Sequence, residues 1–444
     1  MKQRKLSADI IRSYIESDLL GLQKKTGVSE PLKIGVELEL FPISENSINE
    51  IKPAQLYNGN NPIIPSLIKI SEQYDKISKS RAFKINPNTD LTLVDKIPFS
   101  NGNSIFFEPG GQLEISTKPC LSLADLEHQI KFGQKILKEV THLSGINFQQ
   151  YGINPIKIKK LTNQLQKPRY IALENYLNSI SKYGRKMMLK TCSMHINVDV
   201  GDEESIKAKR LIAANLLVPF TTAIFANSYK INKNRKPFKS YRSYIWQNMD
   251  NSRTGILSLH KPLQSLSIQD LVDEYYKFTI NAPLIYMSEF GAQVLSKEMT
   301  LKYWMGNKIN DAWPTVLDLK NHISLLFPEV RIQKGYLELR SIDSPPLEWQ
   351  LSPICFYTGL LYDSKNLDTI IDLLKPLYPI YSVLYKESCY GLESKKIRDI
   401  SKTLMGLSIE GFSRLPSSFK NEGYKEKLEH FNNKFLIHGK NFTD

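Results

Sequence analysis

Hydrophobic and polar residues alternate one by one in several short stretches of this chain. In KIGVELEL (33–40), every second residue is isoleucine, valine or leucine, and the residues between them include Glu37 and Glu39. Strict alternation is typical of a β-strand with one buried face and one polar face. SMHINVDV (193–200) and GYLELR (335–340) have the same pattern. Three strands are therefore predicted, each with an apolar face and a polar face.

A fourth stretch, FEPGGQLEIS (107–116), predicts a β-hairpin. A turn at Pro-Gly-Gly would pair Glu108 with Gln112, and Glu114 then follows on the same face as Gln112. The alternative is that these glutamates and those of the other strands only line a solvated sheet face, which needs no function.

Helical spacing of apolar residues appears in nine segments. These are residues 8–24, 122–141, 203–228, 268–281, 312–326, 347–362, 367–389, 393–406 and 422–435. Ser122 and Ser267 stand where N-caps are expected. Helices and antiparallel strands together predict an α+β fold. No linker or repeat divides the chain, so we expect one domain over residues 1–444 with a helical C-terminal region from about 366.

The sequence shows no export or membrane-spanning signal. Charged residues interrupt the first twenty positions, and Asn215 and Pro219 interrupt the most apolar long run, 211–227, which we interpret as a buried helix. The four cysteines are widely separated and form no CxxC pair. We expect a cytoplasmic protein with no disulfide framework and no zinc ribbon. The sequence does not decide between a monomer and a homodimer.

The polar faces of the predicted strands are mostly acidic, although the whole chain carries a formal net charge of +14. Concentrated carboxylates repel one another unless a cation lies among them. Hard divalent cations with oxygen ligands, such as Mg²⁺, are suitable candidates. Basic residues gather elsewhere, in KIKK (157–160) and in residues 229–242, where aromatic residues lie between them. That second segment is either a rim that attracts anionic substrates or a solvated loop without a role.

Eight ordered stretches resemble a known family. They are GVELEL, FEPGGQLEIS, KPRYIALENYL, CSMHINVDV, FANS, SYRSYIWQNMDNSRTG, NHISLLFPEVR and YLELR. In order and spacing, over about residues 30–365, they resemble blocks of the plant and bacterial glutamate-cysteine ligases. The resemblance implies a fold similar to the catalytic domain of glutamine synthetase, a curved antiparallel β-sheet with helices packed on its outer face. It also implies dependence on ATP and on two or more Mg²⁺ ions.

The resemblance assigns roles to individual residues. It implies metal ligands at Glu37, Glu39, Glu108, Glu114, Glu338 and His195, ATP contacts at Asn197 and Arg331, substrate contacts at Arg242 and Trp246, and catalytic roles for Arg253 and Arg340. His195 stands where the plant enzymes have glutamine, and packing is an equal alternative to metal ligation. A surface ion pair is the alternative for Arg331, and His322 is expected to cap a helix or lie in the core.

The implied reaction joins the γ-carboxylate of glutamate to the amine of cysteine through a γ-glutamyl phosphate. The departure at His195 leaves a different acceptor amine open. A second alternative is a basic nucleic-acid-binding protein whose acidic strands are incidental. We expect small-molecule substrates, with neither nucleic acid nor membrane as a partner.

Overall fold

The computed structural model describes residues 5–22, 32–45, 51–57, 62–78, 90–156, 162–232, 236–287, 292–293 and 298–444. The basic stretch 157–160 lies outside these residues. The strands are β1 (Ile34–Glu45), β2 (Ile51–Pro53), β3 (Lys96–Pro98), β4 (Ser104–Phe107), β5 (Leu113–Ser116), β6 (Ile146–Gln149), β7 (Met194–Asp199), β8 (Thr254–Gly255), β9 (Tyr286–Met287), β10 (Ala292–Gln293), β11 (Phe327–Pro328), β12 (Val330–Gln333) and β13 (Tyr336–Leu339). The main α-helices are α1 (Ala8–Ser13), α2 (Ile63–Ser78), α3 (Leu123–Ser144), α4 (Pro168–Ile180), α5 (Gly184–Lys190), α6 (Glu204–Ile224), α7 (Tyr241–Gln247), α9 (Ile268–Asn281), α10 (Leu301–Gly306), α11 (Val316–Ile323), α12 (Leu351–Leu361), α13 (Ser364–Leu374), α14 (Tyr381–Ser388), α15 (Lys395–Arg414) and α16 (Glu422–Lys434).

The main sheet contains all four strands predicted from alternation. Its order is β12-β13-β7-β1-β5-β4-β3, with β2 and β6 also paired to β1, and every pair in it is antiparallel. The β4–β5 hairpin closes as expected, because the Glu108 amide donates to the Gln112 carbonyl at 2.9 Å. The α+β fold class is confirmed.

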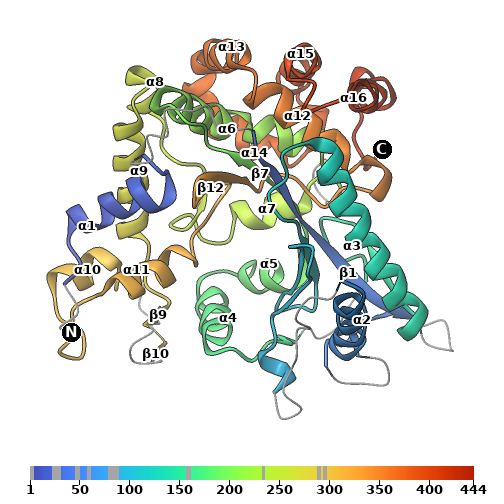
Figure 1. Ribbon diagram of the computed structural model, residues 1–444. Coiled ribbons are helices and arrows are strands. Elements are labelled where there is room, and N and C mark those ends of the chain that lie inside the picture. Colours follow the sequence, from blue (N-terminus) through green and yellow to red (C-terminus); the bar gives the residue numbers. More distant parts are fainter. Residues whose placement is uncertain are drawn as a thin grey trace.

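Helices cover the apolar face of this sheet. Val36, Ile115 and Ile196 belong to one large hydrophobic core together with α3, α6, α12 and α15. In Figure 1, α3 lies to the right of the sheet, the C-terminal helices lie above it, and α4 and α5 lie to the left of its lower part. A second, smaller core joins α4, α5 and α7, from Ala172 to Leu325. The apolar faces therefore point outward to helices, which confirms the prediction.

Most predicted helices are present, with differences at their ends. The Ser122 and Ser267 hydroxyls accept backbone N–H groups as N-caps of α3 and α9, as predicted. The expected helix 367–389 is broken, because Pro376 and Pro379 lack the N–H that a helix interior needs, and a 3₁₀ segment (Lys375–Ile380) separates α13 from α14. The helix expected over 312–326 is only α11. No described helix is long and apolar enough to cross a bilayer.

Candidate active site

The polar faces of β1, β5, β7 and β13 meet on the inner side of the sheet. The strand register places Glu39 opposite Glu114, Glu37 opposite His195, and Glu338 opposite Asn197. Residues directly opposite in antiparallel strands have side chains within contact distance. Residues separated by up to about 300 positions in the sequence therefore form one acidic cluster, as the alternation predicted.

His195 lies at the centre of this cluster. Its Nδ1 is 2.8 Å from the Glu37 Oε2 and 3.5 Å from the Glu338 Oε1, and its Nε2 is 2.8 Å from the Ser193 hydroxyl. Two groups of side chains offer ligand atoms that lie within 4.8 Å of one another: Glu37, His195 and Glu338, and Glu39, Glu114 and His195. Five of the six predicted metal ligands are thus close enough to share cations, and Glu108 lines the cavity beside them.

Burial and mutual repulsion disfavour the charged forms of the hairpin glutamates. Burial, and then the charge of Glu37, raise the pKa of Glu114 well above its usual value. Burial, and then the charge of Glu39, raise the pKa of Glu108 to about 8. A bound divalent cation would reverse both effects by offsetting the carboxylate charges. The cluster therefore fits Mg²⁺ through its chemistry, with mainly carboxylate oxygen donors.

Glu338 differs from the other carboxylates because two arginines already compensate it. Arg331 donates to both of its oxygens, at 2.9 and 2.7 Å, and Arg340 also donates to it. Burial opposes ionisation, but the charges of Arg331 and Arg340 outweigh it and hold the pKa of Glu338 well below its usual range. The pair is not the surface ion pair considered for Arg331, since Glu338 is buried and Arg331 is mostly buried in the site.

A cavity of about 200 Å³ opens beside the acidic cluster. One wall carries Arg340, Trp246 and Phe327, and the other is formed by α4, α5 and the β4–β5 turn. The residues of this second wall include Pro109, Gln112, Arg169, Tyr170, Leu173, Met187, Met188 and Thr191.

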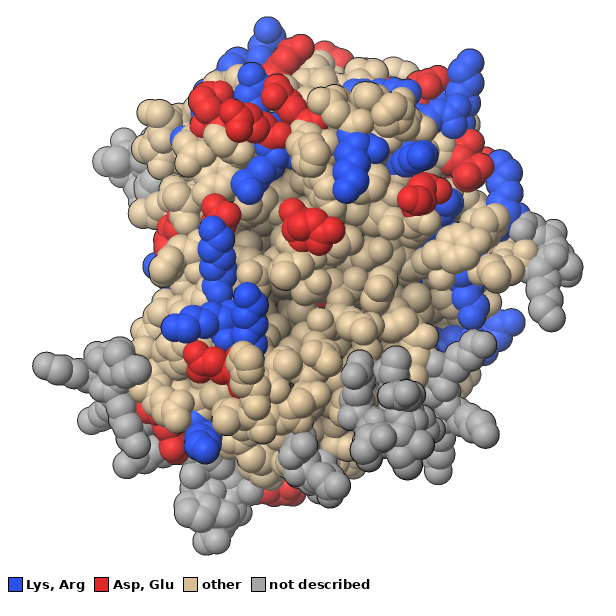
Figure 2. All heavy atoms as spheres, turned by 90° about the vertical axis from the view of Figure 1, so that its right-hand side faces the viewer, with Lys and Arg blue, Asp and Glu red and all other residues tan. Residues whose placement is uncertain are grey.

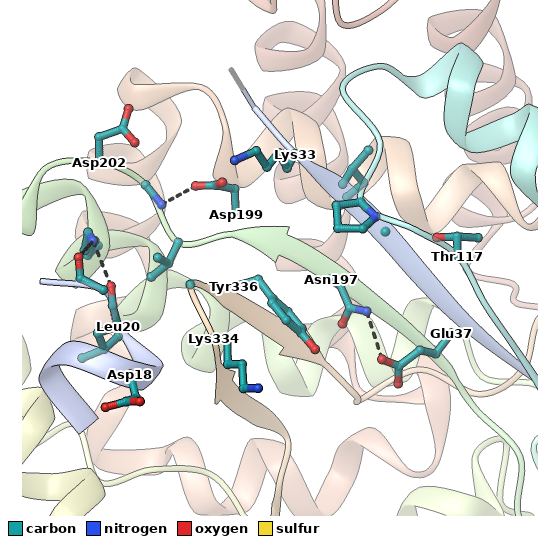
Figure 3. A pocket seen from close by; sticks show the side chains of 18 of the residues that line it. Asp18, Leu20, Lys33, Glu37, Thr117, Asn197, Asp199, Asp202, Lys334 and Tyr336 are labelled. Atoms are coloured by element: carbon teal, nitrogen blue, oxygen red, sulfur yellow. Dashed lines mark hydrogen bonds between the residues drawn. The ribbon is translucent and has the colours of Figure 1, made fainter. Parts of the chain in front are cut away.

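A larger cavity, of about 650 Å³, lies at the other end of the same strands. Figure 3 shows it between the end of β7, the Lys334–Tyr336 turn and the Asp18–Leu20 segment, with Lys33 and Lys334 among its lining residues. Asn197 lies at its inner end and donates to Glu37 at 3.1 Å. Glu37 lines both cavities, so they meet at the acidic cluster.

Arg242 contacts two residues that line the smaller cavity. Its side chain is 3% exposed, it donates to the Arg340 carbonyl at 2.8 Å, and its guanidinium lies 5.5 Å from the centre of the Trp246 ring. Trp246 and Arg340 line the cavity. Direct substrate contact by Arg242 stays a prediction. Its hydrogen bond to the Arg340 carbonyl and its contact with the Trp246 ring hold those two residues in place.

The contacts of Arg253 favour a role other than the predicted catalytic one. The side chain is fully buried, and its three nitrogens donate to Asp250 at 2.8 Å, to the Leu325 carbonyl at 3.0 Å and to the Pro283 carbonyl at 2.7 Å. A guanidinium whose three nitrogens are all engaged in this way braces the surrounding scaffold. The catalytic role of Arg253 stays a prediction, and these contacts favour a bracing role.

His322 and the basic segment have structural contacts. His322 is 2% exposed and its Nε2 donates to the Thr279 carbonyl at 2.8 Å, which confirms a core role. In the described part of residues 229–242, Phe238 packs on Tyr244 with ring centroids 4.4 Å apart, and Lys239 pairs with Asp444. These contacts favour a structural role for that part of the segment.

Several residues at the site were not predicted individually. Arg169 and Tyr170 belong to the KPRYIALENYL stretch, where Pro168 at the first helical position was the available signal for α4. Gln112 directly precedes β5, and Lys33 directly precedes β1. Their positions in the cavities depend on segments that are distant in sequence.

The comparison with protein families decides what this site belongs to. The model of glutamate-cysteine ligase family 2 (GCS2) matches residues 34–407. This chain belongs to glutamate-cysteine ligase family 2. The resemblance seen in the sequence is confirmed, and the family region extends into α15, beyond the limit of about 365 inferred from the eight stretches.

Plant glutamate-cysteine ligases are similar to this chain over most of its length. The chloroplastic enzyme of Brassica juncea is 28% identical over 407 residues, covering 89% of this chain and 73% of its own. That of Medicago truncatula is 30% identical over 330 residues, covering 72% and 63%. A solved glutamate-cysteine ligase from Francisella tularensis, in complex with AMP, covers 91% of this chain and 82% of its own at 13% identity and a TM-score of 0.49. The family assignment therefore comes from sequence.

Proposed function

We propose that this chain joins the γ-carboxylate of L-glutamate to the amine of L-cysteine with consumption of ATP. Membership of glutamate-cysteine ligase family 2 supports this reaction. The structural observation that carries the proposal is the meeting of a larger and a smaller cavity at Glu37. A nucleotide in the larger cavity would direct its terminal phosphate towards amino acids in the smaller one.

The acidic cluster would hold two or more Mg²⁺ ions in this proposal. Glu37, Glu39 and Glu114 would supply carboxylate oxygens, with His195 and Glu108 beside them. The ions would offset the charges of the ATP phosphates and of the carboxylates. Asn197 has a buried Oδ1 without a partner among the described residues, at the inner end of the larger cavity, where the phosphates would lie.

The reaction would proceed in two displacements. The γ-carboxylate oxygen of glutamate attacks the terminal phosphorus of ATP, the bond to ADP breaks, and γ-glutamyl phosphate forms. The neutral amine of cysteine then attacks the acyl carbon, the acyl C–O bond to phosphate breaks, inorganic phosphate leaves, and the nitrogen loses one proton to form the amide. Arg340, which lines the smaller cavity and is fixed by Glu338 and Arg242, is placed to stabilise the transferring phosphoryl group.

The apolar residues that line the smaller cavity would help to select the acceptor amino acid. Leu173, Met187 and Met188 would contact its side chain, and a thiol is compatible with methionine sulfur and leucine. Arg169, in the same wall, would bind the α-carboxylate of one of the two amino acids. A short amino acid other than cysteine fits this description too, and it is the main alternative.

Feeding the purified protein with ATP, Mg²⁺, glutamate and a panel of amines tests these proposals. We expect ADP release that depends on glutamate, and a product with the mass of γ-glutamylcysteine. Hydroxylamine should trap the acyl phosphate as a hydroxamate. A product with another amine would identify the alternative acceptor, and no ADP release with any amine would contradict the ligase.

The nucleic-acid alternative predicts a continuous basic surface. On the face shown in Figure 2, Lys and Arg side chains lie next to Asp and Glu over the upper part, and the centre is largely uncharged. Mixed charges on this face do not form the continuous basic surface that nucleic-acid binding would need, so they favour the ligase function over that alternative. Tight RNA or DNA binding with a steep loss on adding salt would support the alternative.

A further inference from the structure

Three residues that line the smaller cavity carry buried polar atoms that have no partner within the described chain. These atoms are the amide oxygen Oε1 of Gln112, the indole nitrogen Nε1 of Trp246 and the guanidinium nitrogen Nε of Arg169. Gln112 is 3% exposed and Trp246 is 9% exposed. Polar atoms buried in native proteins nearly always have partners, so exceptions that line a cavity point to a ligand. One of these atoms is an acceptor and two are donors.

The orientation of the Gln112 amide is fixed by its surroundings. Its Nε2 donates to the Thr191 carbonyl at 3.0 Å and to the Met188 carbonyl at 3.4 Å. Because carbonyl oxygens only accept, the NH₂ group must face them and cannot exchange places with Oε1. Oε1 is therefore a fixed acceptor.

The glycines of the hairpin turn make this arrangement possible. A Cβ at Gly110 would lie 2.6 Å from Gln112 Oε1 and 2.5 Å from the Leu189 carbonyl, and both distances are too short for real contacts. Gly111 has φ +87°, which favours glycine. The Pro-Gly-Gly turn therefore leaves the space beside Oε1 free of side chains.

We propose that Gln112 Oε1 accepts a hydrogen bond from the α-ammonium group of an amino-acid substrate, whose carboxylate binds Trp246 Nε1 and Arg169. This inference rests on the ligase function proposed above and adds a specificity-determining residue to it. The position suits a cation, because Glu114 lies two residues along the same strand face as Gln112. A site built around an N–H group rejects an analogue that lacks it.

Comparing glutamate with glutarate, which lacks the α-amine, tests the proposal. In Gln112→Met, which keeps the volume and removes the acceptor, we expect the preference for glutamate over glutarate in kcat/KM to fall roughly 10- to 100-fold. The change should appear mainly in KM for glutamate, with KM for ATP unchanged. Trp246→Phe is the matched control, because it should weaken both substrates and leave their ratio unchanged.

Calorimetric binding of glutamate and glutarate to metal-free protein repeats the test without turnover. This experiment distinguishes the proposed contact of Gln112 from the proposed ligase function. Wild-type protein that binds glutamate but releases no ADP would contradict only the ligase function. A rise confined to KM for the acceptor would assign the ammonium to that substrate and still support the proposal. Equal losses for glutamate and glutarate with an unchanged KM for the acceptor, or a fall in Mn²⁺ affinity measured by electron paramagnetic resonance, would overturn it.

Discussion

The molecule buries charged and polar groups in two neighbouring regions, and their partners differ. Around Arg253, the buried ionisable groups Arg253, Asp250 and His322 have matching partners: Asp250 accepts from both Arg253 and Tyr176, and His322 donates to Thr279. In the acidic cluster, carboxylates crowd together and lack enough cations. Matched burial holds a scaffold together, whereas unmatched burial marks the place where ligands supply the missing charge.

Removing a carboxylate from the unmatched region should have the largest effect. We expect Glu114→Ala to lower kcat by at least about 1,000-fold, or about 4 kcal/mol, because a cation site at the transferring phosphoryl group is lost. ADP release with glutamate measures this loss. Glu274→Ala, which removes a carboxylate paired with Lys277 on α9, is the control. Peptide synthesis that survives in Glu114→Ala would exclude the acidic cluster as the catalytic centre.

Removing a charge from the matched region should affect folding instead. Arg253→Met leaves Asp250 without its cation, and we expect it to lower the free energy of unfolding by about 3–5 kcal/mol. Urea denaturation measures the change. Arg12→Met, which breaks an exposed pair with Asp273, should cost no more than about 1 kcal/mol.

The same variant decides the role of Arg253. If it only braces the scaffold, kcat per folded molecule stays at the wild-type level at a temperature where Arg253→Met remains folded. A large fall in kcat under those conditions would support the catalytic assignment.

A cation should stabilise the folded protein through the unmatched region alone. At about 100 times its Kd, Mg²⁺ should raise the free energy of unfolding by about 2.7 kcal/mol, because it binds the folded state only. Thermal melts with and without Mg²⁺ measure this shift, which Glu114→Gln should reduce and Glu274→Gln should not. An unchanged shift in Glu114→Gln would place the cation elsewhere.

The two regions also differ in how far the sequence predicts them. Alternation in 33–40, 107–116, 193–200 and 335–340 was sufficient to place the carboxylates on one face, because a strand's side chains alternate by geometry. For Arg253, the sequence showed an arginine in a family stretch, but its partners include carbonyls at residues 283 and 325, which lie far along the chain. Residue type alone does not distinguish a guanidinium bound to Asp250 from one that binds substrate.

The second wall of the smaller cavity was missed for a related reason. α5 and α7 have seven residues each, too few for a clear helical period, and α4 starts without a side-chain cap. Gln112 was placed on the correct strand face, but the direction of its amide depends on two carbonyls near α5. Local pattern predicts which face a residue occupies, and tertiary contacts decide what its atoms can bind.

The smallest expected effect is a dependence of the free energy of unfolding on pH, which comes from His322 in the matched region. Burial, and then the charge of Arg253, lower the pKa of His322 from 6.5 to about 4. Between these values the unfolded chain binds more protons than the folded one, so the stability due to neutral His322 is complete above pH 6.5 and is lost progressively towards pH 4. From pH 7 to pH 5 we expect a loss of about 2 kcal/mol from this residue.

Urea denaturation of wild type and His322→Gln at both pH values measures that contribution, with His438→Gln, at an exposed position, as the control. The difference between pH 7 and pH 5 should shrink by about 2 kcal/mol in His322→Gln. An unchanged difference would mean that His322 is not held neutral. The matched region would then contain a charge without a partner, and the contrast with the acidic cluster would be lost.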